Sequence, residues 1–347
     1  MSEKKKLLFI YPQLYTFVKT DLELLSDKFQ IISFNQKWSS KYLLPFNLIV
    51  QFFYLLFNIV KVDKILISFG GYHSLLPALF GKIFNKKIFI IVHGTDCVSF
   101  PEINYGNLRN PIMRFFISNA YNLVDKILPV SKSLVYTKNT YYSKTPIEFG
   151  YSYHLKDITT PYKVIHNAVD HSFWCKDKKT LKDNTTFISV LSNGKEHIKG
   201  IDLLCEVTSS FPNCKFFLAG IDKIDSLKIP KNVICLGRLN PKQLREYYSK
   251  SRFYLQLSNT EGFGVSLCEA MLCECIPIVS SVNMLPEIVG DTGFILESRD
   301  SSMLSRLIND AISCNFDLLS KKARLKIKDN YYMQKRKSSL TKELTSK

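Results

Sequence analysis

Residues 258–271 read Ser-Asn-Thr-Glu-Gly-Phe-Gly-Val-Ser-Leu-Cys-Glu-Ala-Met. An apolar run at residues 253–257 precedes them, and apolar side chains then recur at Cys268, Met271, Leu272 and Cys275. Spacings of three, four and seven residues place side chains on one buried face of a helix. The pattern therefore predicts a strand, a short loop with two glycines, and a helix that begins at about Gly264.

The predicted start of this helix is suited to binding a phosphate. The first amides of a helix have no partner inside it and carry a partial positive charge, and glycines let a ligand approach the backbone. Glu261 precedes the helix and Glu269 lies within it. Eight helical residues span about 12 Å, so a diphosphate could lie between a sugar held by Glu261 and a ribose held by Glu269. The alternative is a strand-turn-helix with two solvated glutamates.

The segment from Glu261 to Glu269 resembles the E-x7-E signature of the family 4 retaining glycosyltransferases. The resemblance implies an α/β protein with the GT-B fold. In that fold two Rossmann-like domains have parallel sheets that face each other across a cleft, and a C-terminal helix crosses back to the first domain. The resemblance also implies a catalytic role for Glu261 and donor binding by Gly262, Phe263, Gly264, Val265 and Glu269.

A second matching segment follows the apolar run at residues 88–92, which we interpret as a buried strand. It reads His93-Gly-Thr-Asp96 and is similar to the HG-x-D segment of the family, whose histidine lies beside the donor sugar. Ligands of open α/β sheets bind at the carboxyl ends of the strands. The resemblance therefore assigns His93 a catalytic role, and a purely structural histidine is the alternative.

Three basic residues are further candidates for donor binding. Lys199, followed by a glycine, matches the Lys-Gly pair with which the family clamps the diphosphate. The family's arginine in the same loop is replaced here by Asn-Gly-Lys. Lys195 is therefore a candidate for the same role, with a compact ammonium group in place of the two-pronged guanidinium of arginine. Arg238 lies in a Gly-Arg-Leu segment that resembles the loop around the nucleotide base. Lys195 and Arg238 could instead be solvated surface charges.

The chain departs from the family pattern at three further places. Ala168 stands in a glycine position, which requires a backbone angle that alanine tolerates. Glu274 stands where glycine usually ends the helix, and it is strained if its backbone is left-handed. Residues 11–17 replace the Gly-Gly loop that follows the first strand in many members, so acceptor-site residues are not carried over from the family.

A chain of 347 residues suits two domains. Strand-like and helix-like segments alternate in the first half, which is typical of a parallel sheet covered by helices. We predict an acceptor domain over residues 1–170, a linker over 171–186 and a donor domain over 187–318. Residues 319–347 are predicted to form a basic helix or tail that packs towards the first domain.

The net charge of +17 implies an anionic partner, such as a nucleotide-sugar, a nucleic acid or an anionic membrane surface. Residues 319–347 alone contain ten Lys or Arg and two acids. Residues 43–60 are strongly apolar, but Asn47, Gln51 and Asn58 interrupt them near one helical face. This pattern favours a buried or interface-lying helix over a membrane crossing.

The nine cysteines are scattered, and no secretory signal is visible, which indicates reduced thiols in a cytoplasmic protein. Cys268, Cys273 and Cys275 lie close in sequence, but two of them belong to the buried helical face and no second cluster follows. We therefore predict no metal site there. A peripheral location at the inner face of the cell membrane is a further hypothesis.

The predicted function is that of a retaining, metal-independent hexosyltransferase. It would move a sugar from a nucleoside-diphosphate sugar to a glycan or lipid-linked acceptor in envelope polysaccharide synthesis, with no cofactor beyond the donor substrate. Another GT-B enzyme, an epimerase or a phosphorylase, is the first alternative. A basic nucleic-acid-binding protein is the second, although no aromatic and basic recognition motif is present, so we predict no nucleic-acid partner.

Overall fold

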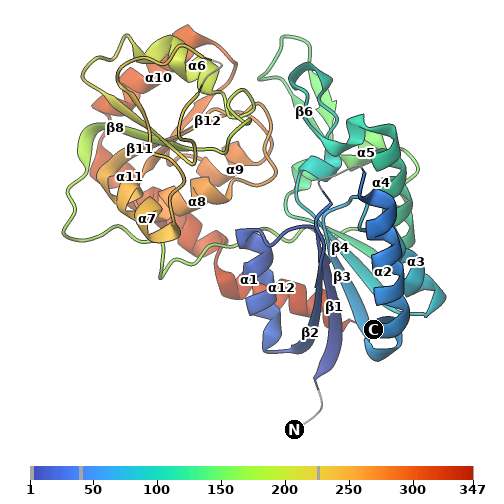
Figure 1. The fold of residues 1–347 in the computed structure, drawn as a ribbon. Helices are drawn as coiled ribbons and strands as arrows, with labels where there is room; N and C mark the ends of the chain where they lie inside the picture. Colours follow the sequence, from blue (N-terminus) through green and yellow to red (C-terminus); the bar gives the residue numbers. More distant parts are fainter. Residues whose placement is uncertain (1–3, 39–41, 225–226, 347) are drawn as a thin grey trace. The chain divides into compact units, whose positions relative to one another are not determined.

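The computed structural model describes residues 4–38, 42–224 and 227–346. Their fold divides into two compact units, each with a parallel sheet and covering helices (Figure 1). The first unit comprises residues 1–137, 148–168 and 333–347, and the second comprises residues 138–147 and 169–332. Each unit is therefore assembled from segments that are far apart in sequence.

The first unit contains a five-stranded parallel sheet in the order β2-β1-β3-β4-β5. Central strands of a parallel sheet are covered on both faces, so β3 and β4 are buried along almost their whole length. The strands are β1 (Lys5–Tyr11), β2 (Phe29–Asn35), β3 (Lys64–Ser68), β4 (Lys87–Val92) and β5 (Lys126–Pro129).

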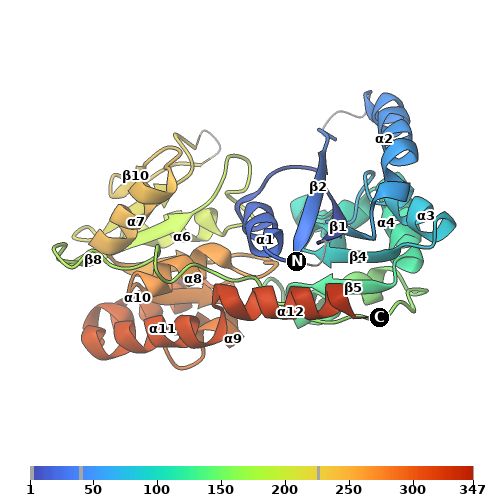
Figure 2. The same cartoon turned by 90° about the horizontal axis from the view of Figure 1, so that it is seen from below.

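Helices of the first unit pack as two groups. Helix α1 packs against α12, whereas α3 packs against both α2 and α4 (Figures 1 and 2). The helices are α1 (Thr16–Ser26), α2 (Leu44–Asn58), α3 (Leu75–Ile83), α4 (Pro111–Leu123), α5 (Tyr151–His154) and α12 (Met333–Thr345). Short 3-10 turns are η1 (Ile59–Lys61), η2 (Thr95–Cys97), η3 (Pro101–Ile103), η4 (Asn107–Arg109) and η5 (Lys132–Leu134).

The C-terminal helix α12 belongs to the first unit, as the resemblance predicted. Arg336 is 2% exposed and donates to both carboxylate oxygens of Asp21 on α1, at 2.5 and 2.6 Å. It also donates to the backbone carbonyls of Ile165 and His166. Helix α11, by contrast, belongs to the second unit, so the basic segment 319–347 is divided between the two units.

The second unit contains a six-stranded parallel sheet in the order β10-β9-β8-β11-β12-β13. Strand β8 begins inside the segment that we expected to be a linker. The strands are β8 (Asp183–Val190), β9 (Lys215–Ala219), β10 (Val233–Cys235), β11 (Ser251–Gln256), β12 (Ile276–Ser280) and β13 (Phe294–Leu296). The helices are α6 (Ile201–Thr208), α7 (Pro241–Lys250), α8 (Val265–Leu272), α9 (Leu285–Val289), α10 (Ser301–Ser313) and α11 (Phe316–Asn330).

Residues 138–147 come from the first half of the chain but group with the second unit. They contain the loop that joins β6 (Thr137–Asn139) to β7 (Ile147–Phe149), and these two strands form a two-stranded ribbon. The Asn139 side chain is buried and donates to the carbonyl of Asn259 at 2.7 Å, and the amide of Arg299 donates to the carbonyl of Tyr141 at 2.9 Å. These contacts place the segment beside the loop that precedes α8.

Helix α8 ends in a left-handed residue that is not glycine. Glu274 has φ of 63°. Its amide donates to the carbonyl of Met271, and the next amide, of Cys275, donates to the carbonyl of Ala270. This pair of bonds is the Schellman motif, which usually contains glycine at this position. Glu274 therefore has the left-handed backbone that strains a glutamate at this position, whereas Ala168 does not have a positive φ.

Candidate functional site

The loop and helix predicted from residues 258–271 are present in the second unit. Strand β11 ends at Gln256, and α8 begins at Val265 after Gly264, whose φ is 103°. A Cβ atom at Gly264 would meet a side-chain carbon of Leu285 at 3.0 Å. No side chain of the described residues caps the start of α8, so its first amides are available to a ligand.

The buried face of α8 agrees with the predicted spacing. Three of the side chains that the sequence placed on it are fully buried there: Cys268, Met271 and Leu272. Cys275, which was predicted on the same face, is also fully buried but lies beyond the end of α8. Burial of this face fixes the helix against the sheet, and it determines where the first turn and Glu269 lie.

Glu261 and Lys199 are bonded to each other. Lys199 Nζ lies 2.6 Å from Glu261 Oε2, and the Gln256 amide donates to the same oxygen at 2.6 Å. The backbone amide of Gly262 donates to Oε1 of Glu261, and the backbone amide of Glu261 donates to the Asn283 side chain at 2.9 Å. Both charged side chains keep about one fifth of their surface exposed. The structure therefore brings a sugar-binding candidate and a diphosphate-binding candidate into one cluster.

Gly200 explains why a glycine follows Lys199. Its φ is 68°, and a Cβ atom there would lie 2.1 Å from the carbonyl oxygen of Leu257 at the end of β11. Only glycine allows this close approach of two backbones. The Lys-Gly pair therefore positions the Lys199 loop beside the loop that carries Glu261.

Four polar residues that the sequence reasoning missed support this cluster. The Tyr254 hydroxyl lies 3.0 Å from Gln256 Oε1 and 2.8 Å from Ser266 Oγ in the first turn of α8. Asn283, with φ of 52°, accepts the amide of Glu261. The one available sequence signal was Gln256, a polar residue at the end of an otherwise apolar run, because buried polar side chains need partners.

Glu269 is a buried carboxyl group, 8% exposed. Its side chain has no hydrogen bond or ion pair within the described part of the chain. Burial raises its pKa from 4.5 to about 8. A buried polar group without a partner is unfavourable, so Glu269 is poised to accept hydrogen bonds from a ligand with hydroxyl groups.

The remaining donor candidates differ in how they are placed. Lys195 and Arg238 are exposed side chains on loops. The Phe263 ring is 2% exposed and packs edge-on against Tyr331, with ring centroids 5.4 Å apart. Phe263 can therefore offer a ligand only its backbone. Val265 is half-buried in the first turn of α8.

His93 belongs to the first unit and follows β4. Its ring lies against Phe17 and Phe69, with centroids 4.4 and 4.3 Å away, and Nε2 lies 2.9 Å from Ser68 Oγ. Burial, with a smaller contribution from the Arg336 charge, holds its pKa well below the ordinary value, so the ring is neutral at pH 7. Nδ1 is buried and has no partner among the described residues. The ring therefore has one nitrogen available to a ligand.

Asp96 organises the turn around His93, a role that the sequence reasoning did not assign. Its carboxylate accepts the amides of Gly70, His93 and Gly94 at 2.8 to 3.2 Å, and the Tyr121 hydroxyl lies 3.2 Å from it. Burial raises the pKa of Asp96, and the backbone donors oppose that rise. Asp96 thus ties the ends of β3 and β4 together.

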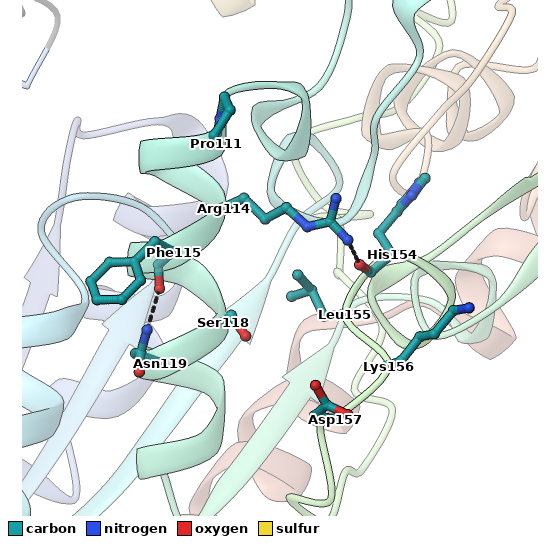
Figure 3. A pocket seen from close by; sticks show the side chains of 9 residues that line it. All are labelled: Pro111, Arg114, Phe115, Ser118, Asn119, His154, Leu155, Lys156 and Asp157. Atoms are coloured by element: carbon teal, nitrogen blue, oxygen red, sulfur yellow. Dashed lines mark hydrogen bonds between the residues drawn. The ribbon is translucent and has the colours of Figure 1, made fainter.

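The described residues of the first unit line at least two cavities. A cavity of about 470 Å³ between α4 and residues 154–157 is shown in Figure 3, where Arg114 donates to the carbonyl of His154 across it. It contains none of the residues predicted for catalysis or donor binding. A second cavity of about 260 Å³ lies at the carboxyl ends of β1, β3 and β4, and its lining includes Pro12, Tyr15, Trp38, Phe69, Tyr72 and His73.

No group of three or more His, Cys, Asp or Glu side chains is placed to hold a metal ion among the residues that the structure describes. Cys268, Cys273 and Cys275 are free and fully buried.

A family comparison identifies the second unit. Residues 173–332 match the family described as glycosyl transferases group 1. The second unit, which contains this segment, belongs by this match to the group 1 glycosyltransferases. The match contains Lys199, Glu261 and Glu269, and it confirms the predicted family for this segment.

The curated relatives of the chain are distant. An uncharacterised 41.2 kDa protein in the cps region of Klebsiella pneumoniae is 25% identical over 259 residues, 70% of this chain and 66% of the relative. The O-antigen chain mannosyltransferase B of Escherichia coli is 36% identical over 70 residues, 20% of this chain and 18% of the relative. The chain thus spans less than two thirds of the length of each.

Solved structures confirm the predicted GT-B fold over nearly the whole chain. The sucrose-phosphate synthase of Thermosynechococcus elongatus has a TM-score of 0.79 at 11% identity and covers 98% of both chains. Anabaena HepE, solved in complex with UDP and glucose, has a TM-score of 0.75 at 14% identity and covers 99% of this chain and 100% of its own. At these identities the likeness concerns the fold alone.

Proposed function

We propose that this group 1 glycosyltransferase moves a sugar from a nucleoside-diphosphate sugar to a hydroxyl of a glycan or lipid-linked acceptor in envelope polysaccharide synthesis. We further propose that the anomeric configuration is retained. The donor class is supported by the HepE complex with UDP and glucose, and the biological setting by the names of the Klebsiella and Escherichia relatives.

The observation that carries the proposal is the arrangement around α8. Its uncapped start, at Gly264, follows the loop in which Glu261 is paired with Lys199. Five residues later lies Glu269, a buried carboxyl group without a partner among the described residues. We assign the diphosphate to the helix start, the ribose hydroxyls to Glu269 and the hydroxyls of the transferred sugar to Glu261.

Lys199 has a specific task in this scheme. Negative charge builds on the leaving diphosphate as the glycosidic bond breaks, and prearranged positive groups that stabilise such charge are often the largest catalytic contribution. Lys199 would exchange Glu261 for the diphosphate when the donor binds. That exchange would free the Glu261 carboxylate to accept the sugar hydroxyls. Lys195 and Arg238, both exposed, are assigned weaker contacts to the diphosphate and the base.

We propose that His93 binds the transferred sugar through Nδ1, the buried nitrogen that lacks a partner. We propose that the acceptor uses the 260 Å³ cavity of the first unit. Aromatic side chains such as Tyr15, Trp38 and Tyr72 line this cavity, and aromatic rings suit the apolar faces of sugars. The cavity also lies at the carboxyl ends of strands, the usual ligand position in such sheets.

We propose a cytoplasmic location. All nine cysteines are free in the structure, which supports a reducing compartment. Fractionation of the producing cells, followed by immunoblotting, tests this, and recovery of the protein outside the cytoplasm and cytoplasmic membrane contradicts it.

A thermal-shift screen tests the proposed donor site. UDP, GDP, ADP and their sugars are compared, because a ligand that binds the folded state stabilises it by mass action, by about 2.7 kcal/mol at a hundredfold excess over Kd. We expect one base series to raise the Tm, and Glu269→Ala to lose that shift. Leu325→Ser, an exposed position on α11, is the matched control and should keep it. Absence of a shift with every nucleotide contradicts the proposal.

A further inference from the structure

Helix α2 has its polar and apolar faces reversed relative to a normal surface helix. Asn47, Gln51 and Leu55 face inward and are at most 6% exposed. The exposed positions from residue 46 to residue 60, the last of which lies in η1, are all large and apolar: Phe46, Ile49, Val50, Phe52, Phe53, Leu56, Phe57 and Val60. At 100° per residue these eight side chains cover an arc of about 160°. We call this set the apolar face of α2.

The orientation of α2 is fixed by specific bonds on its inner side. The Gln51 amide donates to the carbonyl of His73 at 2.9 Å. The Asn47 amide donates to the carbonyl of Lys37 at 2.8 Å and accepts from Gln36 at 2.9 Å. The Tyr54 ring also stacks on the ring of Phe34 in β2. The apolar face therefore points outward because the inner polar groups hold it there.

The surroundings of this face carry positive charge. From residue 28 to residue 95 the sequence has eight lysines and one acid, Asp63. Asp63 accepts the backbone amide of Lys6 at 2.7 Å. Exposed lysines lie near both ends of α2: Lys37, whose carbonyl binds Asn47, and Lys61, which ends η1.

We propose that the apolar face of α2 docks on an anionic lipid bilayer, with α2 lying in the plane of the interface. A helix with one strongly apolar face and flanking lysines binds such surfaces through buried apolar area and attraction to anionic headgroups. Helix α3, which packs against α2, extends the apolar surface with Leu79 and Ile83, which are 37% and 73% exposed. This inference does not depend on the proposed donor or reaction.

A membrane crossing fits the structure less well. Leu44–Lys61 is the one helix of the described residues that is long and apolar enough to cross a membrane, and 22% of it is buried. A crossing would break the bonds of Asn47 and Gln51 and expose their amides to hydrocarbon, where unsatisfied polar groups are costly. An in-plane position keeps those bonds.

A second copy of the chain is also a weaker choice of partner. A stable protein interface usually has a polar rim with hydrogen bonds around its apolar centre. The apolar face of α2 has no polar side chain among its exposed members, and two copies would bring like charges together at Lys37 and Lys61.

Vesicle flotation of the full chain tests the proposal. We compare phosphatidylcholine vesicles with vesicles that also contain phosphatidylglycerol, at low and at high salt. Wild type should float with the anionic vesicles, and less so at high salt because headgroup attraction is screened. Phe53→Ser/Phe57→Ser should lower the bound fraction about tenfold or more, since two apolar anchors are lost. Leu318→Ser/Leu325→Ser, which removes equally exposed side chains of α11, should bind like wild type.

Two further measurements make the result specific. Phe57→Trp should show blue-shifted emission with anionic vesicles and quenching by brominated acyl chains. Wild type bound to vesicles should be released by alkaline carbonate, as an interface-lying helix is. Equal flotation of wild type and Phe53→Ser/Phe57→Ser overturns the proposal, as does wild type that binds no vesicle. Resistance to carbonate overturns the proposal in favour of a membrane crossing. If wild type binds no vesicle but forms a dimer that Phe53→Ser/Phe57→Ser abolishes, the proposal is overturned in favour of a second copy of the chain.

Discussion

Lys199 Nζ and Glu261 Oε2 lie 2.6 Å apart, so the residues assigned to the diphosphate and to the sugar are each other's partners in this structure. The pair is partly exposed, and Gln256 also donates to the Glu261 oxygen. A diphosphate competes well for Lys199 because it carries more charge than one carboxylate, while Gln256 and the Gly262 amide continue to hold Glu261.

Removal of the Lys199 charge should slow the transfer strongly. We expect Lys199→Ala to lower kcat/KM by about 100- to 1,000-fold, the usual cost of losing one group that stabilises developing negative charge. Lys195→Ala, at an exposed loop position, is the control and should cost less than about tenfold. Initial-rate kinetics with the donor found in the nucleotide screen provide the measurement. Equal losses for the two variants would place the diphosphate elsewhere.

Donor affinity should depend on pH through Glu269. Its pKa of about 8 means that the group is mostly protonated at pH 7, whereas two ribose hydroxyls bind best to the ionised form. A nucleoside-diphosphate sugar does not itself titrate in this range. We therefore expect its Kd to fall about 10- to 30-fold between about pH 6.5 and 8.5. Calorimetry should show proton release, and Glu269→Gln should bind weakly with a flat profile.

The same pKa predicts how stability changes with pH. Burial raises the pKa of Glu269 in the folded state above its unfolded value, so the folded state binds the proton more tightly. The stability of the free protein that depends on this group is present below the unfolded pKa and is lost as the pH rises towards about 8. The Tm of Glu269→Gln minus that of wild type should therefore increase with pH across this window. A constant difference would contradict the assignment.

The left-handed end of α8 offers a stabilising substitution. Glu274→Gly should raise the free energy of unfolding by about 1 kcal/mol. The αL conformation costs an L-residue about 1–2 kcal/mol, and part of the relief is offset because glycine loses more conformational entropy on folding. In thermal unfolding this corresponds to a Tm increase of about 2–4 °C for a unit of this size. Glu274→Ala removes the same charge but keeps the strain, so it should show no such gain. A matching gain for Glu274→Ala would mean that the carboxylate, and not φ, is responsible.

The buried pair Asp21–Arg336 should contribute far more to the first unit than its exposed neighbour. Asp21→Asn leaves the Arg336 charge buried without its counter-ion and should cost about 3–5 kcal/mol. Asp27→Asn breaks the exposed pair between Asp27 and Lys337 on the same two helices and should cost little. Hydrogen exchange of the β1 amides reports the stability of this unit directly. Similar exchange in both variants would contradict the prediction.

Much of the fold could be predicted from local patterns. The face of α8, the start of that helix beside Gly264 and the strain at Glu274 all follow from spacing and from the cost of a left-handed backbone. The polar stripe Asn47-Gln51-Asn58 indicated that α2 has one distinctive side. It did not reveal that the polar side faces inward, because the partner carbonyls of Lys37 and His73 are supplied by other segments.

The candidate site was predicted only in part, because its key contacts join distant segments. Lys199 and Glu261 are 62 residues apart, and no local pattern indicates that they are bonded. Asn139 reaches the carbonyl of Asn259 across 120 residues, so the contribution of residues 138–147 to the second unit was missed.

The place of α12 in the first unit has a consequence for how the chain acquires its structure during synthesis. Asp21 emerges from the ribosome more than three hundred residues before its partner Arg336. Until then α1 lacks the helix that packs against it. The Asp21 carboxylate, which is buried in the folded unit, therefore has to remain hydrated. The first unit therefore cannot finish folding before translation has passed α12, although most of its residues are made first.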